Sequence, residues 1–287
     1  MSSPEVPPLE PVPVGKPSRA GRNLPAAVGS AAVLLVVIGA SLLFWKPAFI
    51  LVALAAVLVA IWEFKQVFAV HGVHMPWQPV MAGAVVMLGG AYAGGAPALV
   101  TAMAVTALAA LLWRLRSGVD GFVRDATAAV FTAAYVPLLA GFVVLLLAPE
   151  DGAMRVVTFI LVTIASDIGG YFVGVLVGRH PMAPVISPKK SWEGFAGSAV
   201  FCVGAGWACV VYLLNGDWWV GVVLGAVAVV MATMGDLCES VIKRDLGIKD
   251  MSSIVPGHGG VMDRLDSLLA TVAPTWLLLY YLVPVVS

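Results

Sequence analysis

The residues best suited to chemistry lie between positions 240 and 266, where cations and carboxylates gather in a chain that is otherwise strongly apolar. Charged groups beside hydrocarbon are costly, and they are retained where they hold ions, substrates or a water-filled cavity. The segment combines phosphate-binding cations with carboxylates, which are the ligands that hard divalent cations prefer. We therefore expect the activity to lie here.

One stripe of a helix face can be drawn at the start of this segment. If the preceding apolar helix continues through its polar end, a carboxylate, a hydroxyl and two cations fall at i, i+4, i+7 and i+8, namely Asp236, Ser240, Lys243 and Arg244. The alternative is a helix end carrying ordinary cations, with Glu239 and Lys243 as an i, i+4 pair. These few residues alone leave both interpretations open.

A glycine-rich turn and two further acids complete the segment. Residues 256–260 read Pro-Gly-His-Gly-Gly, which can present consecutive backbone N–H groups to an anion without obstruction by Cβ atoms. Asp263 and Asp266 follow at a spacing of three, which places both carboxylates on one side of a helix and suits Mg²⁺ that also binds phosphate oxygens. Either acid alone would be an ordinary helix N-terminal residue. Two acids flanking Arg264 after such a turn favour a metal site.

A second polar cluster occurs earlier in the chain. Asp167 lies deep in an apolar run, where an unpaired carboxylate would be expensive, so a cation or hydrogen-bond partner is expected. The run Ser-Pro-Lys-Lys-Ser-Trp-Glu-Gly at 187–194 then opens the next apolar span. Its Lys189 and Lys190 could instead be simple topology signals, and Ser191 a helix cap.

The elements that must position these residues are membrane helices. The chain is 61% hydrophobic and 11% charged with a mean hydropathy of +0.99, which excludes an ordinary soluble domain. Equal totals of 16 basic and 16 acidic residues give no net field to attract nucleic acid. About nine apolar runs are long enough to cross a bilayer: 26–45, 47–69, 79–94, 97–113, 126–148, 154–177, 195–214, 218–240 and 265–285. We predict an all-α polytopic membrane protein with a polar cavity that faces the cytoplasm.

The distribution of basic residues predicts the orientation of these spans. Lys and Arg in short loops favour the cytoplasmic side of a membrane. With nine spans and the N-terminus inside, only Lys46 and Arg155 fall on the outer side. We therefore expect a multi-pass protein of the cell (plasma) membrane, with its N-terminus and active site in the cytoplasm.

The first 22 residues differ from the rest of the chain. They hold six prolines and almost no large apolar residues, which is typical of a disordered tail. We divide the chain into a Pro-rich cytoplasmic tail at 1–22 and a transmembrane domain at 23–287, whose catalytic part spans about 154–287.

The charged segment resembles a known signature. The phosphatidate cytidylyltransferases, also called CDP-diacylglycerol synthases, carry S-x-x-K-R-x(4)-K-D and, after a short spacer, H-G-G-x-x-D-R-x-D. The matching positions here are Ser240, Lys243, Arg244, Lys249, Asp250, His258, Gly259, Gly260, Asp263, Arg264 and Asp266. The Asp167 helix and the 187–194 run also resemble this family, with Ser191 where Thr is common, so the likeness covers at least residues 160 to 270. The first four spans are generic by comparison.

The resemblance implies an all-helical membrane enzyme that condenses CTP with phosphatidic acid to give CDP-diacylglycerol and pyrophosphate. It also implies that the protein forms a homodimer and contacts membrane lipids. It implies Mg²⁺ as cofactor and leaves open whether a monovalent cation such as K⁺ joins it. The expected catalytic residues are Lys243, Arg244, Asp263 and Asp266, and the expected metal ligands are Asp236, Asp263 and Asp266. The expected substrate-binding residues are Asp167, Lys189, Lys190, Glu193, Ser240, Lys249, His258, Gly259, Gly260 and Arg264.

This reaction fits the chemistry of the residues. Positioning and charge neutralisation dominate phosphoryl and nucleotidyl transfer, so no nucleophilic side chain is needed. Three rivals are weaker. An ion-coupled transporter does not need a dense Lys-Arg-His-Gly-Gly-Asp loop, and a CDP-alcohol phosphatidyltransferase should show a D-G-x-x-A-R string that is absent from the sequence. A lipid or polyprenol kinase that uses CTP is chemically closest, and product analysis separates it.

Overall fold

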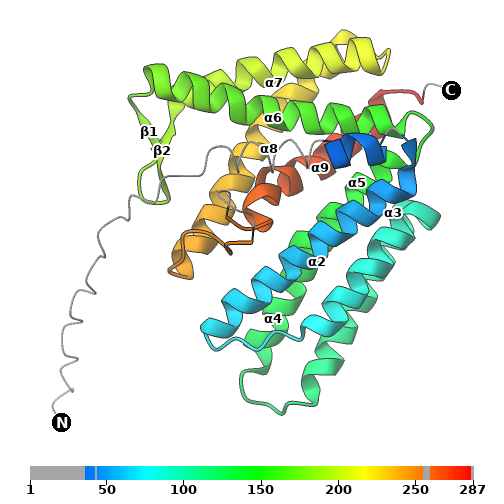
Figure 1. Cartoon of the computed structure of the whole chain (residues 1–287), viewed down its shortest axis with the longest axis vertical. Coiled ribbons are helices and arrows are strands. Elements are labelled where there is room, and N and C mark those ends of the chain that lie inside the picture. Colours follow the sequence, from blue (N-terminus) through cyan, green and yellow to red (C-terminus); the bar gives the residue numbers. More distant parts are fainter. Residues whose placement is uncertain (1–35, 43, 255–258, 286–287) are drawn as a thin grey trace.

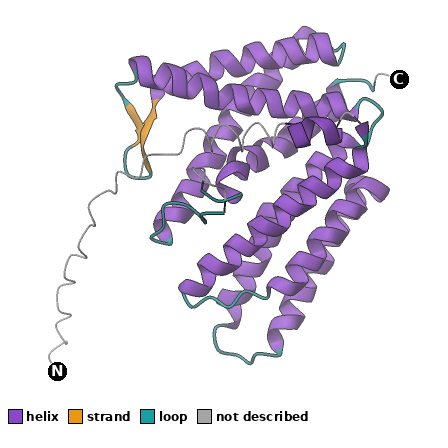
Figure 2. Cartoon of the chain, in the orientation of Figure 1, coloured by secondary structure: helices purple, strands orange, loops and turns teal. Residues whose placement is uncertain are grey.

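The computed structural model describes residues 36–42, 44–254 and 259–285 of the chain, so the predicted tail at 1–22 lies outside the described residues. Within these ranges, seven helices are long and apolar enough to cross a membrane. The predicted all-α membrane fold is confirmed (Figures 1 and 2). The count of nine spans stays a prediction, because most of the first expected span lies outside the described residues.

The N-terminal half contains α2 (Lys46–Val70), α3 (Trp77–Leu115), α4 (Phe122–Ala133) and α5 (Leu139–Leu147). Gly95 interrupts the 39-residue α3 with a φ of 68°, a value that glycine adopts without strain. Thr106 packs directly on Gly83, so the two arms of α3 run antiparallel as a hairpin. The arms correspond to the expected runs 79–94 and 97–113.

A short π-helix, η1 (Ala134–Leu138), joins α4 to α5 within one span. Pro137 lies in this π-helix and has no N–H to donate to the regular helical ladder. Such bulges occur frequently at functional sites. The hydroxyl of Tyr135, which lies in the bulge, is buried and has no hydrogen-bond partner in the described part of the chain.

The C-terminal half contains α6 (Gly152–Val177), α7 (Trp192–Leu213), α8 (Trp218–Asp245) and α9 (Met262–Leu282). Helices α6 and α7 lie side by side (Figure 1), and they can approach closely because glycines face each other, as at Gly169 and Gly197. The antiparallel strands β1 (Pro181–Ala183) and β2 (Ser187–Ser191) connect them, a small sheet that we did not predict. Ser191 caps α7 as expected, since its Oγ accepts from the Gly194 N–H at 3.1 Å.

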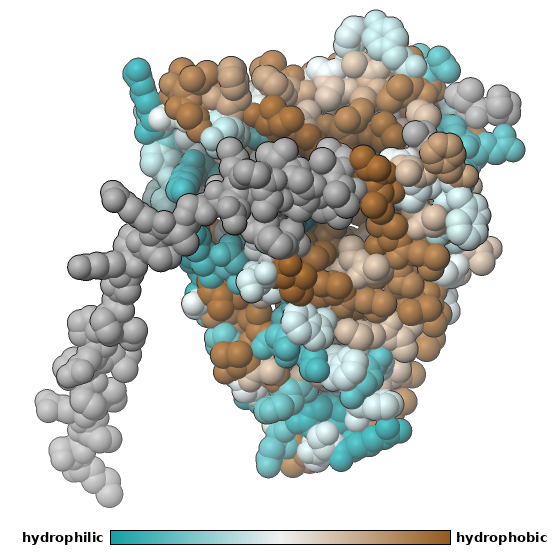
Figure 3. Space-filling view, in the orientation of Figure 1, coloured by the Kyte–Doolittle hydropathy of each residue, from teal (hydrophilic) through white to brown (hydrophobic). Residues whose placement is uncertain are grey.

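Two apolar cores hold the molecule together. One is built mainly from α2, α3, α4 and α5, and the other mainly from α6, α7, α8 and α9. Helix α9 contributes to both cores, so it joins the two halves. Large apolar side chains also cover much of the outer surface (Figure 3), as expected where helices face lipid.

Polar contacts gather at the two ends of the helices. At one end, Lys46 bonds the Pro149 carbonyl, and Arg155 bonds Asp151 and the Leu279 carbonyl. At the other end, loops after the first and second described spans meet at the buried ion pair of Arg114 and Asp125, and hydrophilic side chains gather there (Figure 3). Lys46 and Arg155, the two basic residues expected on the outer side of the membrane, therefore lie at the same end of the helices.

Candidate functional site

A polar cavity of about 360 Å³ lies between α6, α7, α8 and the β1–β2 hairpin. Its lining includes carboxylates, cations and hydroxyls: Asp167, Ser187, Lys189, Lys190, Ser198 and Asp236. Apolar side chains such as Met182 and Phe195 complete the wall. The cavity combines the polar and apolar surfaces that a phosphate-bearing amphiphile would contact.

One ion pair joins the two sequence clusters. The Lys190 ammonium lies 2.6 Å from the Asp236 carboxylate, so β2 contacts α8 across the cavity. Asp236 is 38% exposed at its side chain and remains open to the cavity. Residues separated by a whole membrane span therefore belong to one polar site.

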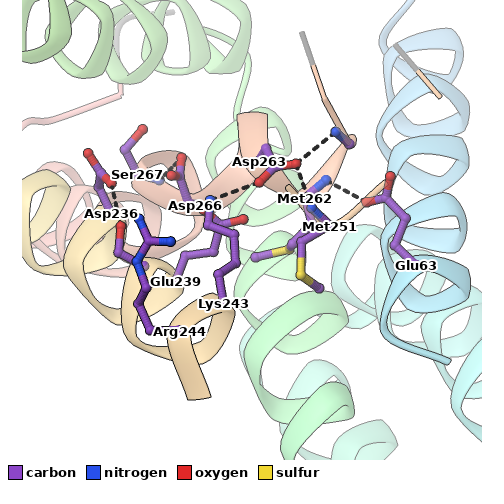
Figure 4. A network of polar contacts seen from close by, with 12 residues as sticks. Glu63, Asp236, Glu239, Lys243, Arg244, Met251, Met262, Asp263, Asp266 and Ser267 are labelled. Atoms are coloured by element: carbon purple, nitrogen blue, oxygen red, sulfur yellow. Dashed lines mark hydrogen bonds and ion pairs between the residues drawn. The ribbon is translucent and has the colours of Figure 1, made fainter. Parts of the chain in front are cut away.

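Helix α8 continues through its polar end as predicted, and it brings three carboxylates near one another. Asp236 and Glu239 both lie within electrostatic range of Asp266 on α9. Figure 4 shows these side chains grouped where α8 meets α9. Glu239 is fully buried, and its Oε1 has no hydrogen-bond partner within residues 36–42, 44–254 and 259–285. When ionised, carboxylates this close together repel one another, and a cation beside them would offset that repulsion.

Lys243 supplies part of that positive charge. Its Nζ lies 2.6 Å from Glu239 Oε2 and 2.8 Å from Asp263 Oδ1, and its side chain is 15% exposed. The i, i+4 pair with Glu239 was the plain alternative for this helix end, and it is present. It coexists with the link to Asp263, so Lys243 connects α8 to the start of α9.

Asp263 is occupied by protein groups on both oxygens. Oδ1 accepts from Lys243, while Oδ2 accepts from the backbone N–H groups of Gly260 at 2.7 Å and Met251 at 2.9 Å (Figure 4). The Gly260 N–H is therefore directed to a carboxylate of the chain itself. Gly259 has a φ of 85°, a left-handed value that favours glycine. His258 lies outside the described residues.

The other predicted residues differ in how close they lie to the cavity. Ser240 donates to Asp236 at 3.4 Å, and Arg244 donates weakly to the Ile186 carbonyl at 3.4 Å, both near the cavity. Glu193 does not line the described cavity; it accepts from the Arg179 and His180 N–H groups and from the His180 ring at the base of the hairpin. Lys249 is exposed beyond α8 and also lies outside the cavity lining. Arg264 lies in the first turn of α9.

A buried acid at this site, Glu63 on α2, was not predicted from the sequence. Its carboxylate accepts from the N–H groups of Val261 and Met262, each at 2.8 Å (Figure 4). It is fully buried. A lone carboxylate inside a membrane helix is a functional-site signal by itself, and that signal could have found Glu63.

The carboxylates fit a divalent cation that shares its coordination with a substrate. In the residues that the structure describes, no group of three or more His, Cys, Asp and Glu side chains is placed to hold a metal ion by itself. Mg²⁺ usually keeps waters and binds one or two carboxylates together with substrate phosphates. Asp236 and Asp266 supply oxygens of this kind, and the unpartnered Glu239 Oε1 lies nearby.

Comparison with known proteins gives a consistent result. Residues 25–282 match the model of the cytidylyltransferase family. The chain is similar to a phosphatidate cytidylyltransferase of Mycobacterium leprae, at 40% identity over 91% of this chain and 89% of the relative. It is also similar to the protein of the same name from Mycobacterium bovis, at 38% identity over 93% of this chain and 92% of the relative. A Helicobacter pylori protein of that name matches 46% of this chain at 38% identity.

Proposed function

Because the chain belongs to the cytidylyltransferase family, we propose that its polar cavity is where it condenses CTP with phosphatidic acid. The chain is a nucleotidyltransferase of phospholipid biosynthesis, and its products are CDP-diacylglycerol and pyrophosphate. The single observation that carries the assignment to this cavity is the contact between Lys190 and Asp236. That contact brings the cations of the hairpin to the carboxylates of α8 and α9.

The reaction exchanges one phosphoanhydride for another. A phosphate oxygen of the lipid attacks the α-phosphorus of CTP, a new P–O bond forms, and the bond from this phosphorus to the bridging oxygen of pyrophosphate breaks. The protein need only align the two phosphates and neutralise them. Lys189 and Lys190 line the cavity where this charge would lie, and Arg244 lies at its edge. The mixed lining matches a lipid phosphate beside a nucleotide.

We assign the predicted Mg²⁺ to Asp236 and Asp266, with Glu239 nearby. When bound, the ion would polarise phosphate oxygens and stabilise the negative charge of the leaving group. We do not assign Asp263 to the metal ion, because Lys243 and two backbone N–H groups already occupy its oxygens. It holds Lys243 and the start of α9 in place. The homodimer remains a prediction.

The helices make this a multi-pass membrane protein, and we propose that the cavity faces the cytoplasm of a plasma-membrane enzyme. Basic residues are concentrated in the loops on the side of the site, while Lys46 and Arg155 lie at the opposite end. Phosphatidic acid would then enter from the membrane and CTP from the cytoplasm.

Cysteine labelling tests this orientation. In a Cys238→Ala background, which removes the exposed native thiol, we expect Ser117→Cys and Ser253→Cys to react with an impermeant thiol reagent only from the cytoplasm. Glu150→Cys should react only from outside. All three side chains are exposed. Reaction of the Glu150 and Ser253 positions from the same side would contradict the proposed topology.

Product analysis tests the activity. Purified protein incubated with phosphatidic acid, CTP and Mg²⁺ should convert the lipid to CDP-diacylglycerol, as measured by mass spectrometry. A control without CTP should return the starting lipid. A lipid product heavier by one phosphate group instead would identify a CTP-dependent kinase.

A further inference from the structure

The buried carboxylate of Glu63 lies far in sequence from the family signature yet contacts it directly. Glu63 belongs to α2, in the other half of the chain from the signature at 240–266. Its side chain is directed toward the first residues of α9 (Figure 4). Because a buried carboxylate needs partners, the groups that it binds explain its presence in an apolar helix.

Within the described part of the chain, three donors share the two oxygens of Glu63. The Val261 N–H at 2.8 Å and the Ser252 hydroxyl at 2.5 Å donate to Oε1, and the Met262 N–H at 2.8 Å donates to Oε2. Val261 is the N-cap residue of α9 and Met262 is its first residue, and their N–H groups have no acceptor within the helix. No side chain at the N-cap of α9 bonds them. The Glu63 carboxylate, which comes from another helix, therefore caps α9. A negative charge at this position also interacts favourably with the positive N-terminal end of the helix dipole.

The same backbone segments also bind Asp263. Asp263 accepts from Met251, next to Ser252, and from Gly260, next to Val261. Glu63 and Asp263 thus hold the same two segments from opposite sides. The fit is tight, since a Cβ on Gly260 would lie 2.6 Å from Glu63 Oε1 and 3.0 Å from Asp263 Oδ2. This close approach explains glycine at position 260.

We propose that Glu63 is a positioning residue for cytidylyl transfer, an inference that rests on the proposed function. Glu63 bonds Ser252, Val261 and Met262. The first two adjoin Met251 and Gly260, the backbone donors to Asp263. Glu63 thereby sets the place of Asp263 and, through the ion pair of Asp263, the place of Lys243. The first described span is therefore part of the catalytic architecture. Glu63 itself touches neither substrate, because protein donors occupy both of its oxygens.

Glu63→Gln tests the proposal, because the amide keeps the size of the side chain but replaces one acceptor with a donor. We expect kcat per folded molecule to fall about tenfold or more, since bonds to a charged acceptor are lost. The KM for each substrate should change by less than about threefold, because the cavity lysines are untouched. Amide hydrogen exchange of residues 259–265 should accelerate, while exchange in the α3 hairpin should not.

Two comparisons separate positioning from mere stability. Asp125→Asn removes another fully buried acid with three polar partners, but far from the signature, so it should lower the yield of folded protein without changing kcat of the folded fraction. If Glu63→Gln does not fold, Ser252→Ala still removes one bond to Glu63, and it should lower kcat about threefold to tenfold. Its neighbour Ser253→Ala is the matched control and should be unaffected.

The outcomes distinguish this inference from the proposed function. If the wild-type protein fails to make CDP-diacylglycerol, the proposed function is wrong. Hydrogen exchange at residues 259–265 would still show whether Glu63 holds the start of α9 in place. Normal kcat in both Glu63→Gln and Ser252→Ala would overturn the positioning role. So would a loss of activity that only follows the loss of folded protein, with unchanged exchange in residues 259–265.

Discussion

Replacing Asp263 with asparagine should reduce kcat by about 100-fold or more while the protein still inserts and folds, because two or more charge-assisted hydrogen bonds are weakened. The substitution removes the ion pair with Lys243 and leaves an amide group facing backbone donors. Lys243 would then pair only with Glu239 and move away from the start of α9. Steady-state kinetics in detergent or nanodiscs, normalised to folded protein, would measure the loss.

The Mg²⁺ dependence separates Asp263 from the carboxylates that we assign to the metal. Asp266→Asn should raise the Mg²⁺ concentration needed for half-maximal activity, because it removes a proposed ligand. Asp263→Asn should leave that concentration within about threefold of the wild-type value. Rescue of Asp263→Asn by high Mg²⁺ would place Asp263 on the ion and contradict its assignment to Lys243 and the α9 start.

Replacing Lys190 with methionine should lower kcat/KM for CTP or phosphatidic acid by about 30-fold, because a charge-assisted contact worth roughly 2 kcal/mol is lost from the cavity. Methionine keeps the length and much of the apolar stem of the side chain. The Lys190 ammonium also lies 2.6 Å from Asp236, so the substitution removes a positive charge that neutralises this carboxylate. Initial rates with each substrate varied separately would measure the effect.

Arg179→Met is the matched control for Lys190. Arg179 is an exposed cation just before β1, and its side chain does not line the described cavity. If Lys190 were only a topology signal, both variants would keep normal kinetics, because many cytoplasmic cations would remain. Unchanged kcat and KM for both substrates in Lys190→Met would therefore show that the hairpin does not contribute to the catalytic site.

Much of the architecture could be predicted from the sequence because lipid imposes a simple rule. Every backbone polar group must be satisfied within the membrane, so long apolar runs become helices. Even the break between the runs at 79–94 and 97–113 was marked by Gly94-Gly95-Ala96-Pro97, and Gly95 provides the turn. The β1–β2 hairpin was missed because Pro188 and the two lysines resemble a loop, and its pairing depends on tertiary contacts.

The candidate site could be predicted only in part. Helical spacing placed Asp236, Ser240 and Lys243 at one end of α8, since position within a helix is a local property. Spacing could not reveal that Lys190 pairs with Asp236 or that Glu63 caps α9, because each contact joins two elements that are far apart in the sequence. It also could not show that the Gly260 N–H is already bound to Asp263.

The fate of each phosphorus of CTP distinguishes cytidylyl transfer from transfer of a terminal phosphate. Purified protein should be incubated with phosphatidic acid, Mg²⁺ and CTP labelled at either the α- or the γ-phosphorus, with Asp263→Asn as the matched low-activity control. We expect that α-label enters the lipid as CDP-diacylglycerol and that γ-label leaves in pyrophosphate. Entry of γ-label into the lipid without α-label would show transfer of a terminal phosphate and would contradict cytidylyl transfer by this site.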